Sequence, residues 1–387
     1  MKRLAIITTH PIQYYDPVFK LIAENREFEL KVFYTWGKTL NNKYDPGFGK
    51  VIEWDIPLLE GYKYEFLINT AKDPGTHHFF GIKNPDAIKQ INRFSPDILL
   101  ILGWGWSSHL TIIRHYHGKV PIWFRGDSTL LDEKVNLRSL ARTFFLKCIY
   151  SHVDKAFYVG KANKAYFLRN GLKEHQLIYA PHAIDNSRFE LDRNKQTSEI
   201  RQELGLSDTD ILILFAGKFE PKKDPLTLLE AFTQIAKPNL HLLFVGNGIL
   251  EKELTSRVED YNLKRVYFKE FQNQQNLPAY YQACDLFCLP SRGPGETWGL
   301  AINEAMACGK AIFVSDKVGC SADLVKPNVN GGVFNSGNLN SLKDNLTSLV
   351  ESKSKLTKYG LASRKIIADY NFSKIARIII SETNKRS

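Results

Sequence analysis

Short apolar runs alternate with longer amphipathic stretches along the whole chain. In the first half the apolar runs are RLAIITTH, LKVFYTW, DILLILGW, PIWFRGD, KAFYVG and LIYAPHAI. Between most of them lie amphipathic stretches such as DPVFKLIAENRE and NPDAIKQINRF, whose lengths suit crossover helices. This alternation is typical of βαβ units, so it predicts a parallel, doubly wound sheet.

The alternation breaks at residues 189–210, a polar stretch with the sequence FELDRNKQTSEIRQELGLSDTD, and then restarts with ILILFAGK, HLLFVGNG, RVYFKEF, DLFCLPS, KAIFVSD and NGGVFNSG. A length of 387 residues also suits two domains. We therefore predict an α/β protein with two Rossmann-like domains, an N-terminal one over residues 1–195 and a C-terminal one over 196–370. Residues 371–387 contain a last helix, NFSKIARIIISE, that is a candidate for packing back on the first domain. Ligands are expected in a deep cleft between the two sheets.

Composition indicates a cytoplasmic protein. The start, MKRLAIITTHPIQ, loses its apolar character before a signal peptide would be complete, and no run reaches membrane-spanning length. The cysteines are odd in number and show no CxxC spacing, which predicts small buried residues in a reduced protein. They are Cys148, Cys284, Cys288, Cys308 and Cys320.

The net charge of +11 allows three kinds of partner: nucleic acid, an anionic membrane surface or an anionic small substrate. Residues 136–170 alternate basic and aromatic side chains. We interpret them as two amphipathic helices with basic outer faces, whose aromatic residues Phe144, Phe145, Tyr166 and Phe167 point inward. The alternative is a patch that faces a membrane or a polyanion.

The segment PSRGPGETWGLAINEAMACGK, residues 290–310, carries the clearest chemistry. A strand leads into a glycine-rich loop and then into a helix, TWGLAINEAMAC, which Gly309 is expected to end. Such a helix start binds anions. Glu296 precedes the helix and Glu304 lies about two turns inside it. Each carboxylate can accept bonds from both hydroxyls of a diol, so the pair suits a nucleotide sugar, with one sugar on each side of a diphosphate. Alternatively, Glu296 only favours the helix start and Glu304 is solvated.

Two further loops follow strands. FAGKFEPKKDPLTLLEAF, residues 215–232, places Lys218 and Lys223 where two cations could neutralise a diphosphate. FVGNGILEKEL, residues 244–254, places Gly246 and Gly248 at another strand-to-helix turn, where bare backbone could touch a base or ribose. It lacks the full dinucleotide-binding spacing.

Together these segments resemble the retaining nucleotide-sugar glycosyltransferases of the GT-B fold that carry a Glu-x7-Glu motif, glycosyltransferase family 4 or group 1. The resemblance covers most of the second domain through GKFEPKKDPLTLLEAF, FVGNG, NLPAYYQACDLFCLPS, ETWGLAINEAMACGKAIFVSD and NGGVF. It implies that Glu296 binds the hydroxyls of the donor sugar and Glu304 the ribose. Lys223 matches the diphosphate lysine of the family, and Lys218 stands where an arginine is usual. The implied donor-binding residues are Gly217, Lys218, Lys223, Gly246, Asn247, Gly248, Glu296, Thr297, Trp298, Gly299, Leu300 and Glu304.

The first domain resembles the family less. Its first strand-to-helix loop, THPIQYYDP, has Gln13 and Tyr14 where relatives have glycines, and Arg125 stands where relatives often have histidine. Arg125, Asp127 and His10 are candidates for acceptor positioning; alternatively, they are an internal ion pair and a bonded histidine. The candidate catalytic residues are Glu296, Lys223, Lys218, Arg125, Asp127 and His10. We also expect His182 and Asp185 to hold the crossing between domains, and Trp104 and Trp106 either to stack on a sugar or to lie in the core.

The resemblance implies sugar transfer from a nucleotide-diphosphate sugar to a hydroxyl of a glycan or lipid-linked glycan in cell-surface polysaccharide synthesis, with retention of configuration. No cofactor and no metal is expected, because the one DxD pattern, Asp208 to Asp210, precedes a strand. Expected partners are donor, acceptor and an anionic membrane at its inner face, without nucleic acid. The alternatives are a nucleotide-sugar epimerase of the same fold and a noncatalytic protein that binds polyanions or membranes.

Overall fold

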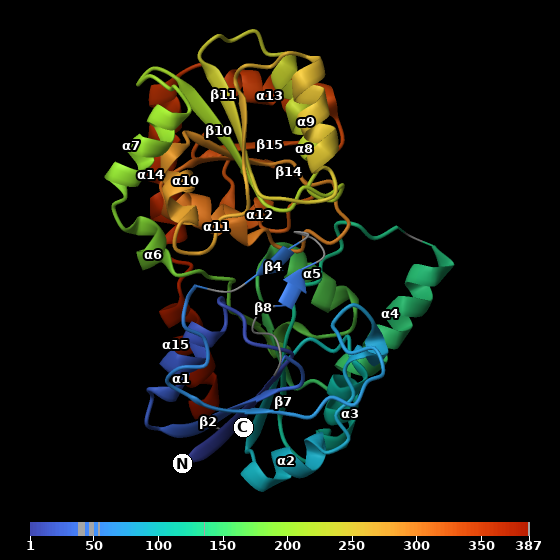
Figure 1. The fold of residues 1–387 in the computed structure, drawn as a ribbon. Helices are drawn as coiled ribbons and strands as arrows, with labels where there is room; N and C mark the ends of the chain where they lie inside the picture. Colours follow the sequence, from blue (N-terminus) through green and yellow to red (C-terminus); the bar gives the residue numbers. More distant parts are fainter. Residues whose placement is uncertain (38–42, 46–49, 53–54, 135, 386–387) are drawn as a thin grey trace. The chain divides into compact units, whose positions relative to one another are not determined.

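The computed structural model describes residues 1–37, 43–45, 50–52, 55–134 and 136–385. The chain divides into two compact units (Figure 1). Unit 1 comprises residues 1–41, 57–182 and 372–387, and unit 2 comprises residues 42–56 and 183–371. This division differs from the predicted boundaries: the main break falls after His182 instead of after residue 195, and the segment around the hairpin β3 (Lys43–Asp45) and β4 (Lys50–Ile52) groups with unit 2.

Unit 1 is built on a seven-stranded parallel sheet with the order β5-β2-β1-β6-β7-β8-β9. Its middle strand, β6, is apolar throughout, as expected for a strand that helices cover on both faces. In β6, all five side chains are buried. The strands are β1 (Lys2–Thr8), β2 (Phe28–Tyr34), β5 (Lys63–Phe66), β6 (Ile98–Leu102), β7 (Ile122–Arg125), β8 (Lys155–Tyr158) and β9 (Leu177–Tyr179).

The helices of unit 1 pack two apolar clusters onto this sheet. Ile91 of α2 and Ile112 of α3 lie in one cluster with β1 and β6, and Leu146 of α4 and Phe167 of α5 lie in the other with β7. The helices are α1 (Asp16–Ala23), α2 (Ala87–Phe94), α3 (Ser107–Tyr116), α4 (Leu137–Tyr150), α5 (Lys161–Arg169) and α15 (Phe372–Asn384), with short 3₁₀ turns η1 (Phe79–Gly81) and η2 (Glu174–Gln176).

The C-terminal helix α15 belongs to unit 1. It packs beside α1, as Figure 1 shows at the opposite ends of the colour scale. Lys155 of β8 pairs with its buried Glu382 at 2.8 Å, and Lys2 of β1 donates to the carbonyl of Thr383 at 2.6 Å. The last helix therefore joins the domain in which the chain begins.

Unit 2 contains a six-stranded parallel sheet with the order β12-β11-β10-β13-β14-β15. Every side chain of β10, β11, β13 and β14 is buried. The strands are β10 (Ile211–Ala216), β11 (Leu240–Val245), β12 (Val266–Lys269), β13 (Leu286–Leu289), β14 (Ala311–Ser315) and β15 (Gly331–Phe334). The helices are α6 (Asn186–Glu190), α7 (Asn194–Glu203), α8 (Pro225–Thr233), α9 (Glu251–Asp260), α10 (Leu277–Ala283), α11 (Leu300–Ala307), α12 (Ser321–Leu324), α13 (Leu339–Leu349) and α14 (Lys353–Ile367).

The two parallel α/β sheets confirm the fold class predicted from the alternating pattern, and each predicted apolar run contains a strand. The pattern missed the edge strand β5 and the hairpin β3–β4.

Two expectations about side chains were wrong. Phe144 and Phe145 are 71% and 45% exposed, whereas Tyr166 and Phe167 are buried as expected, and Cys148 is exposed while the other four cysteines are buried. None of the described helices has both the length and the apolar character needed to cross a membrane.

Candidate functional site

The chain changes winding direction between β10 and β13 of unit 2. It passes from β10 to β11 and β12 on one side, and then crosses to β13 on the other side of β10. In open α/β sheets ligands bind at such a switch point, beyond the carboxyl ends of the strands. The loops after β10 and β13 are also bonded to each other: the Arg292 amide donates to the Lys222 carbonyl at 2.8 Å, and Lys222 Nζ to the Gly295 carbonyl at 3.3 Å.

These two loops bring Lys223 and Glu296 together. Lys223 Nζ donates to Glu296 Oε2 at 2.5 Å, and the Ser291 hydroxyl donates to the same oxygen at 3.0 Å. The side chain of Glu296 is 7% exposed and that of Lys223 is 18% exposed. A carboxylate this buried needs such partners, because burial of an unpaired charge is costly. The structure thus joins two residues that the sequence assigned to one site.

The helix that follows, α11, starts at Leu300, three residues later than the start of the predicted helical segment. Gly299 precedes it with φ +95°, and a Cβ there would lie 2.9 Å from Val318 Cγ1, so the position requires glycine. The first amides of the helix have no partners within it, which favours anions at this end. Thr297 lies in the same turn. The Trp298 carbonyl there accepts a hydrogen bond from the Cys320 amide at 3.0 Å. The Trp298 side chain is buried, with its indole N–H on Asn303.

Glu304 lies about one turn inside α11, not two as predicted, because the helix begins later. Its side chain is 3% exposed, and Oε2 accepts a hydrogen bond from the Tyr281 hydroxyl at 2.9 Å. The alternative interpretation, that Glu304 is a solvated helix residue, is wrong. Tyr281 belongs to α10, and its part in holding this carboxylate was missed from the sequence.

The glycine-containing turns after β10 and β11 pack directly on each other. A Cβ on Gly246 would lie 2.0 Å from the Gly217 carbonyl oxygen, and one on Gly248 would lie 2.5 Å from the Phe219 carbonyl oxygen. Asn247 Oδ1 accepts a hydrogen bond from the Phe271 amide at 2.9 Å. The glycines are therefore required for loop packing. Lys218 is half-buried and lies on the same loop as Lys223.

Three predicted residues lie in unit 1. Arg125, at the end of β7, is buried and donates to the backbone carbonyls of Ala180 and Pro181 at 2.7 and 3.2 Å. Asp127 instead faces His182, whose Nε2 lies 3.8 Å from Oδ2. Burial lowers the pKa of His182, although Asp127 opposes this effect. Asp127 thus lies beside a histidine that the sequence assigned to the domain crossing, and Arg125 bonds the backbone instead of forming the ion pair of the alternative interpretation.

His10 follows β1, at the switch point of the unit 1 sheet between β1 and β6. Its Nδ1 lies 2.9 Å from the Thr9 hydroxyl, and its ring meets Trp36 edge-on at 5.5 Å. The loop after β6 contributes the half-buried Trp104 and Trp106; Trp104 packs on the cluster around Tyr150, and Trp106 meets the His109 ring at 5.1 Å.

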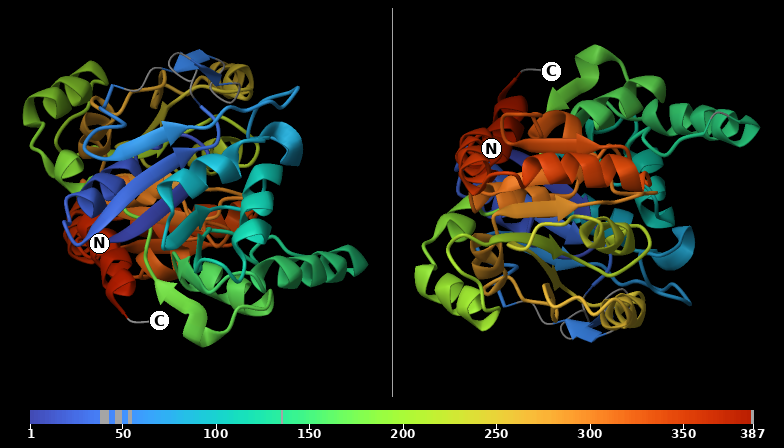
Figure 2. Two further views of the ribbon diagram at one scale, coloured as in Figure 1. Left: turned by 90° about the horizontal axis from the view of Figure 1, so that it is seen from below. Right: turned by 90° about the horizontal axis from the view of Figure 1, so that it is seen from above.

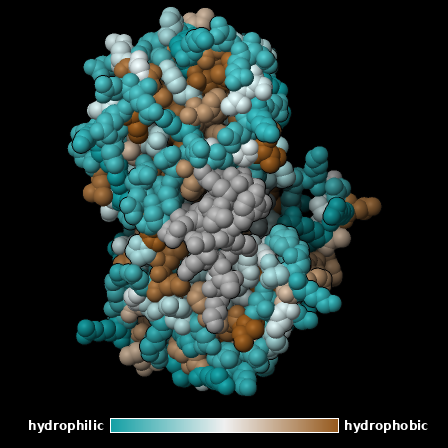
Figure 3. All heavy atoms as spheres, viewed as in Figure 1, coloured by the Kyte–Doolittle hydropathy of each residue, from teal (hydrophilic) through white to brown (hydrophobic). Residues whose placement is uncertain are grey.

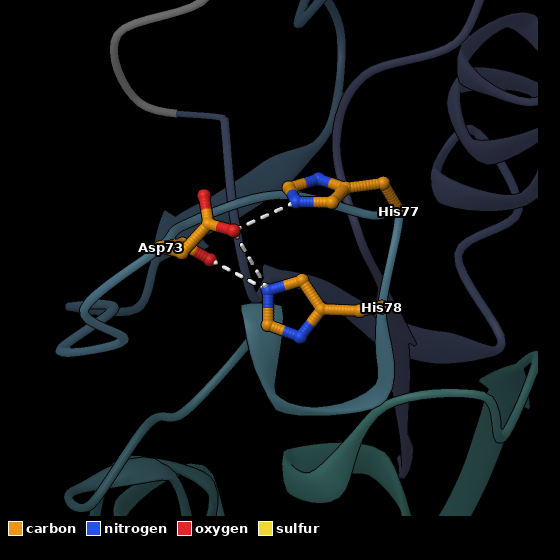
Figure 4. Close-up of side chains that lie close together, drawn as sticks. All are labelled: Asp73, His77 and His78. Atoms are coloured by element: carbon orange, nitrogen blue, oxygen red, sulfur yellow. Dashed lines mark hydrogen bonds and ion pairs between the residues drawn. The ribbon is translucent and has the colours of Figure 1, made fainter.

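Potential metal ligands gather in one further loop of unit 1. Among the described residues, only Asp73, His77 and His78 bring three such side chains together, in a loop of unit 1 (Figure 4). They are hydrogen-bonded to one another: His77 Nε2 lies 3.0 Å from Asp73 Oδ2 and His78 Nε2 lies 3.0 Å from the Asp73 carbonyl oxygen. Asp208 and Asp210 lie in the turn before β10, where Asp210 accepts from the Ser207 amide at 2.7 Å.

Residues 196–366 match the family Glycosyl transferases group 1. This match lies within unit 2 and contains Lys223, Glu296 and Glu304, so the two loops described above are part of the matched region.

Curated relatives align with parts of the chain. A D-inositol 3-phosphate glycosyltransferase from Segniliparus rotundus is 30% identical over 189 residues, 47% of this chain and 41% of the relative. The N-acetylgalactosamine-N,N'-diacetylbacillosaminyl-diphospho-undecaprenol 4-alpha-N-acetylgalactosaminyltransferase of Campylobacter jejuni is 25% identical over 248 residues, 63% of this chain and 64% of the relative. The chain thus spans less than two thirds of the length of these relatives.

Solved structures resemble the whole chain. HepE from Anabaena, in complex with UDP, superposes with a TM-score of 0.75 over 100% of both chains at 18% identity. A sucrose-phosphate synthase from Thermosynechococcus elongatus superposes with a TM-score of 0.74 at 20% identity, over 100% of this chain and 99% of the other. The chain therefore has the GT-B fold, as the resemblance implied.

Several residues that complete the site were missed from the sequence. They sit beside the predicted residues in space: Ser291 and Arg292 follow β13, Lys222 precedes Lys223, and Tyr281 lies on α10. Ser291 had a signal, since it is the first polar residue after the buried run DLFCLP. Tyr281 had none, because an aromatic residue on a short helix is usually part of the core.

Proposed function

We propose that this protein transfers a sugar from a nucleoside-diphosphate sugar to a hydroxyl acceptor. The observation that carries the proposal is the buried Lys223–Glu296 pair at the switch point of the group 1 domain. In this proposal the pair supplies a cation for a diphosphate beside an acceptor for sugar hydroxyls, next to a helix start that favours anions.

The two partners of this pair would separate when the donor binds. In this proposal the Lys223 ammonium moves to the diphosphate, with Lys218 on the same loop as a second cation. Glu296 keeps its bond from Ser291 and accepts hydroxyl protons of the donor sugar, while Glu304 holds the ribose. Exchange of one charged partner for another limits the cost of breaking the pair in a site this buried.

We propose transfer with retention of configuration, as implied by the resemblance to the retaining family that carries the Glu-x7-Glu motif. The departing diphosphate accepts the proton of the acceptor hydroxyl on the face from which it leaves, so the C–O bond to phosphate breaks as the new glycosidic bond forms. Lys223 and the start of α11 stabilise the negative charge that develops on the leaving group. No metal is assigned a role. Positioning of both substrates supplies the rest of the acceleration.

For the acceptor we propose a glycan or lipid-linked glycan of cell-surface polysaccharide synthesis. The C. jejuni relative carries diphospho-undecaprenol in its name, and a Salmonella typhimurium relative, 30% identical over 141 residues, is a lipopolysaccharide 1,2-N-acetylglucosaminetransferase. Peripheral contact with an anionic membrane is part of this proposal. In unit 1, Arg125, Asp127 and His10 remain proposed acceptor-positioning residues.

A panel of UDP, GDP, ADP and CMP tests the donor site. A nucleotide that binds the folded protein raises its unfolding temperature by mass action, and we expect one diphosphate, first of all UDP, to do so. Incubation of the matching nucleotide sugars with glycan acceptors should then release nucleotide only when an acceptor is present. Turnover of the donor alone to an isomer would instead identify an epimerase, and stabilisation by none of the nucleotides would contradict the proposal.

A further inference from the structure

Helix α4 of unit 1 exposes a continuous apolar stripe. Leu137, Leu140 and Phe144 are 86%, 55% and 71% exposed, and Ala141 between them is also exposed. They occupy positions i, i+3, i+4 and i+7, which lie on one face of a helix. Phe145, at 45% exposed, borders the stripe. A soluble surface rarely gathers large apolar side chains in this way without a partner.

The stripe lies opposite the face by which α4 is anchored. Leu146, Ile149 and Tyr150 are buried in the core of unit 1, and Leu146 follows Leu137 by about two and a half turns, which places it on the other side of the helix. The N-terminal turns extend away from the body of unit 1, as Figure 1 and both views of Figure 2 show. A capping box between Asn136 and Ser139 stabilises this exposed start.

Basic side chains flank the stripe. Lys134, Arg138 and Lys147 are exposed, and no carboxylate among the described residues pairs with them. Glu133, which precedes the helix, lies beside Arg142 and Arg169, each at 3.6 Å. Figure 3 shows hydrophobic surface at the projecting tip with hydrophilic surface next to it. The helix thus combines an apolar face with an excess of positive charge.

We propose that the apolar stripe of α4 docks on an anionic lipid bilayer. The helix would lie in the plane of the interface, with Leu137, Leu140 and Phe144 among the acyl chains and Arg138 and Lys147 at the lipid phosphates. The proposed function explains what this binding is for, because the bilayer is where a lipid-linked acceptor is found. The binding itself is inferred from α4 alone. It locates in one helix the membrane contact proposed above.

The charges favour a bilayer over two other occupants. A second copy that paired through the stripe would bring Arg138 and Arg142 of the two helices close together. Like charges at an interface are unfavourable. A nucleic acid would contact the cations, but its phosphates offer nothing to three large apolar side chains directed away from the protein. A surface that is anionic outside and apolar beneath, such as an anionic bilayer, satisfies both features.

Vesicle co-sedimentation tests the proposal, with liposomes of phosphatidylcholine alone and of phosphatidylcholine with about a third phosphatidylglycerol. The full-length protein should bind the anionic vesicles, and high salt should weaken the binding. The double variant Leu140→Ser/Phe144→Ser should reduce the partition coefficient at least about tenfold, because it removes the side chains that insert. Charge reversal in Arg138→Glu/Lys147→Glu should also weaken it.

Unit 2 supplies matched controls. Leu361→Ser/Tyr261→Ser removes one leucine and one aromatic ring that are 57% and 62% exposed, and Lys358→Glu/Lys365→Glu reverses two exposed charges on α14. Both controls should bind vesicles like the wild type, and all variants should keep its far-ultraviolet circular dichroism. Stabilisation by nucleoside diphosphate, measured on the same samples, reports the donor site separately. It should be unchanged in the α4 variants, and its absence in all samples would contradict only the proposed function.

Three outcomes would overturn the proposal. In the first, the wild type fails to bind anionic vesicles. In the second, Leu140→Ser/Phe144→Ser binds them as well as its control does, and DNA competes with vesicles, which would indicate a charge-only polyanion surface. In the third, the same variant converts a dimer to a monomer in sedimentation without loss of vesicle binding, which would assign the stripe to a second copy.

Discussion

Lys223 Nζ and Glu296 Oε2 lie 2.5 Å apart, although the two residues are separated by 73 positions in the chain. The pair exists because β10 and β13 are neighbours in the sheet, so the loops at their carboxyl ends meet. Both side chains are largely buried. The protein without donor therefore already holds, in one contact, the two charges that the proposed chemistry needs.

Removal of Lys223 should affect both stability and donor binding. Lys223→Ala leaves Glu296 buried with only Ser291 as a partner, which should cost about 3 kcal/mol of unfolding free energy. Turnover should fall at least about a hundredfold, because a preorganised charge stabiliser is lost. Lys223→Ala/Glu296→Gln should recover much of the unfolding temperature but not the turnover. Lys252→Ala, an exposed lysine on α9, serves as the control. Recovery of turnover in the double variant would contradict the assignment of Lys223.

The role of Glu304 can be tested with matched ligands. If Glu304 holds the ribose, calorimetric titration should show that Glu304→Gln loses about one to two powers of ten in affinity for the bound nucleoside diphosphate. The 2′-deoxy and 3′-deoxy analogues should bind the wild type more weakly, and Glu304→Gln should discriminate less between them and the parent nucleotide.

Tyr281→Phe separates this role from a structural one. It removes the 2.9 Å hydrogen bond to Glu304 and leaves the carboxylate in place. We expect a small loss of stability, about 1 kcal/mol, and retained discrimination against the deoxy analogues. Equal discrimination by the wild type and Glu304→Gln would mean that Glu304 serves only to bind Tyr281.

Transfer should not need a divalent metal. The proposed charge stabilisers are Lys223, Lys218 and the start of α11, so turnover should survive excess EDTA. The exposed Asp73–His77–His78 group could bind an added transition metal, and His77→Ala/His78→Ala should leave turnover unchanged with and without chelator. Loss of turnover in EDTA, with recovery on addition of magnesium or manganese, would show that the site uses an ion.

Asp16 should make the stability of the protein depend on pH. It lies in the first turn of α1, where burial raises its pKa from 3.8 to about 6, while hydrogen bonds from the Ile12 amide and the Tyr34 hydroxyl oppose the rise. Since the folded state binds this proton more tightly than the unfolded state, the contribution of Asp16 falls as pH rises from about 4 to about 6.

Asp16→Asn removes this titration and keeps an acceptor for Tyr34. We expect the variant to be more stable than the wild type at pH 7 by about 2 to 3 kcal/mol, since one pKa unit corresponds to about 1.4 kcal/mol. The difference should shrink toward zero near pH 4. Thermal unfolding of both proteins between pH 4 and 7 measures it, and a gap that stays constant across this range would contradict the raised pKa.

Much of the molecule follows from local sequence. The fully apolar runs predict β6, β10 and β13, because a strand covered by helices on both faces must be apolar at every position. The positions of β10 and β13 also predict that the loops after them can meet, since the carboxyl ends of parallel strands share one edge. For the same reason Lys223, Glu296 and Glu304 could be assigned to one domain before their contacts were known.

Tertiary structure alone decided which side chains meet. Periodicity does not contain strand order, so the contact of Lys223 with Glu296 became visible only when β13 was placed beside β10. Arg125 donates to backbone carbonyls, because the end of β7 faces the segment after β9. Asp127 lies beside His182 instead. The pattern of α4 predicted that Phe144 points inward, but burial depends on what packs against each side of the helix. Leu146 lies in the core of unit 1, whereas Phe144 is 71% exposed in the described structure, and no local rule could distinguish the two.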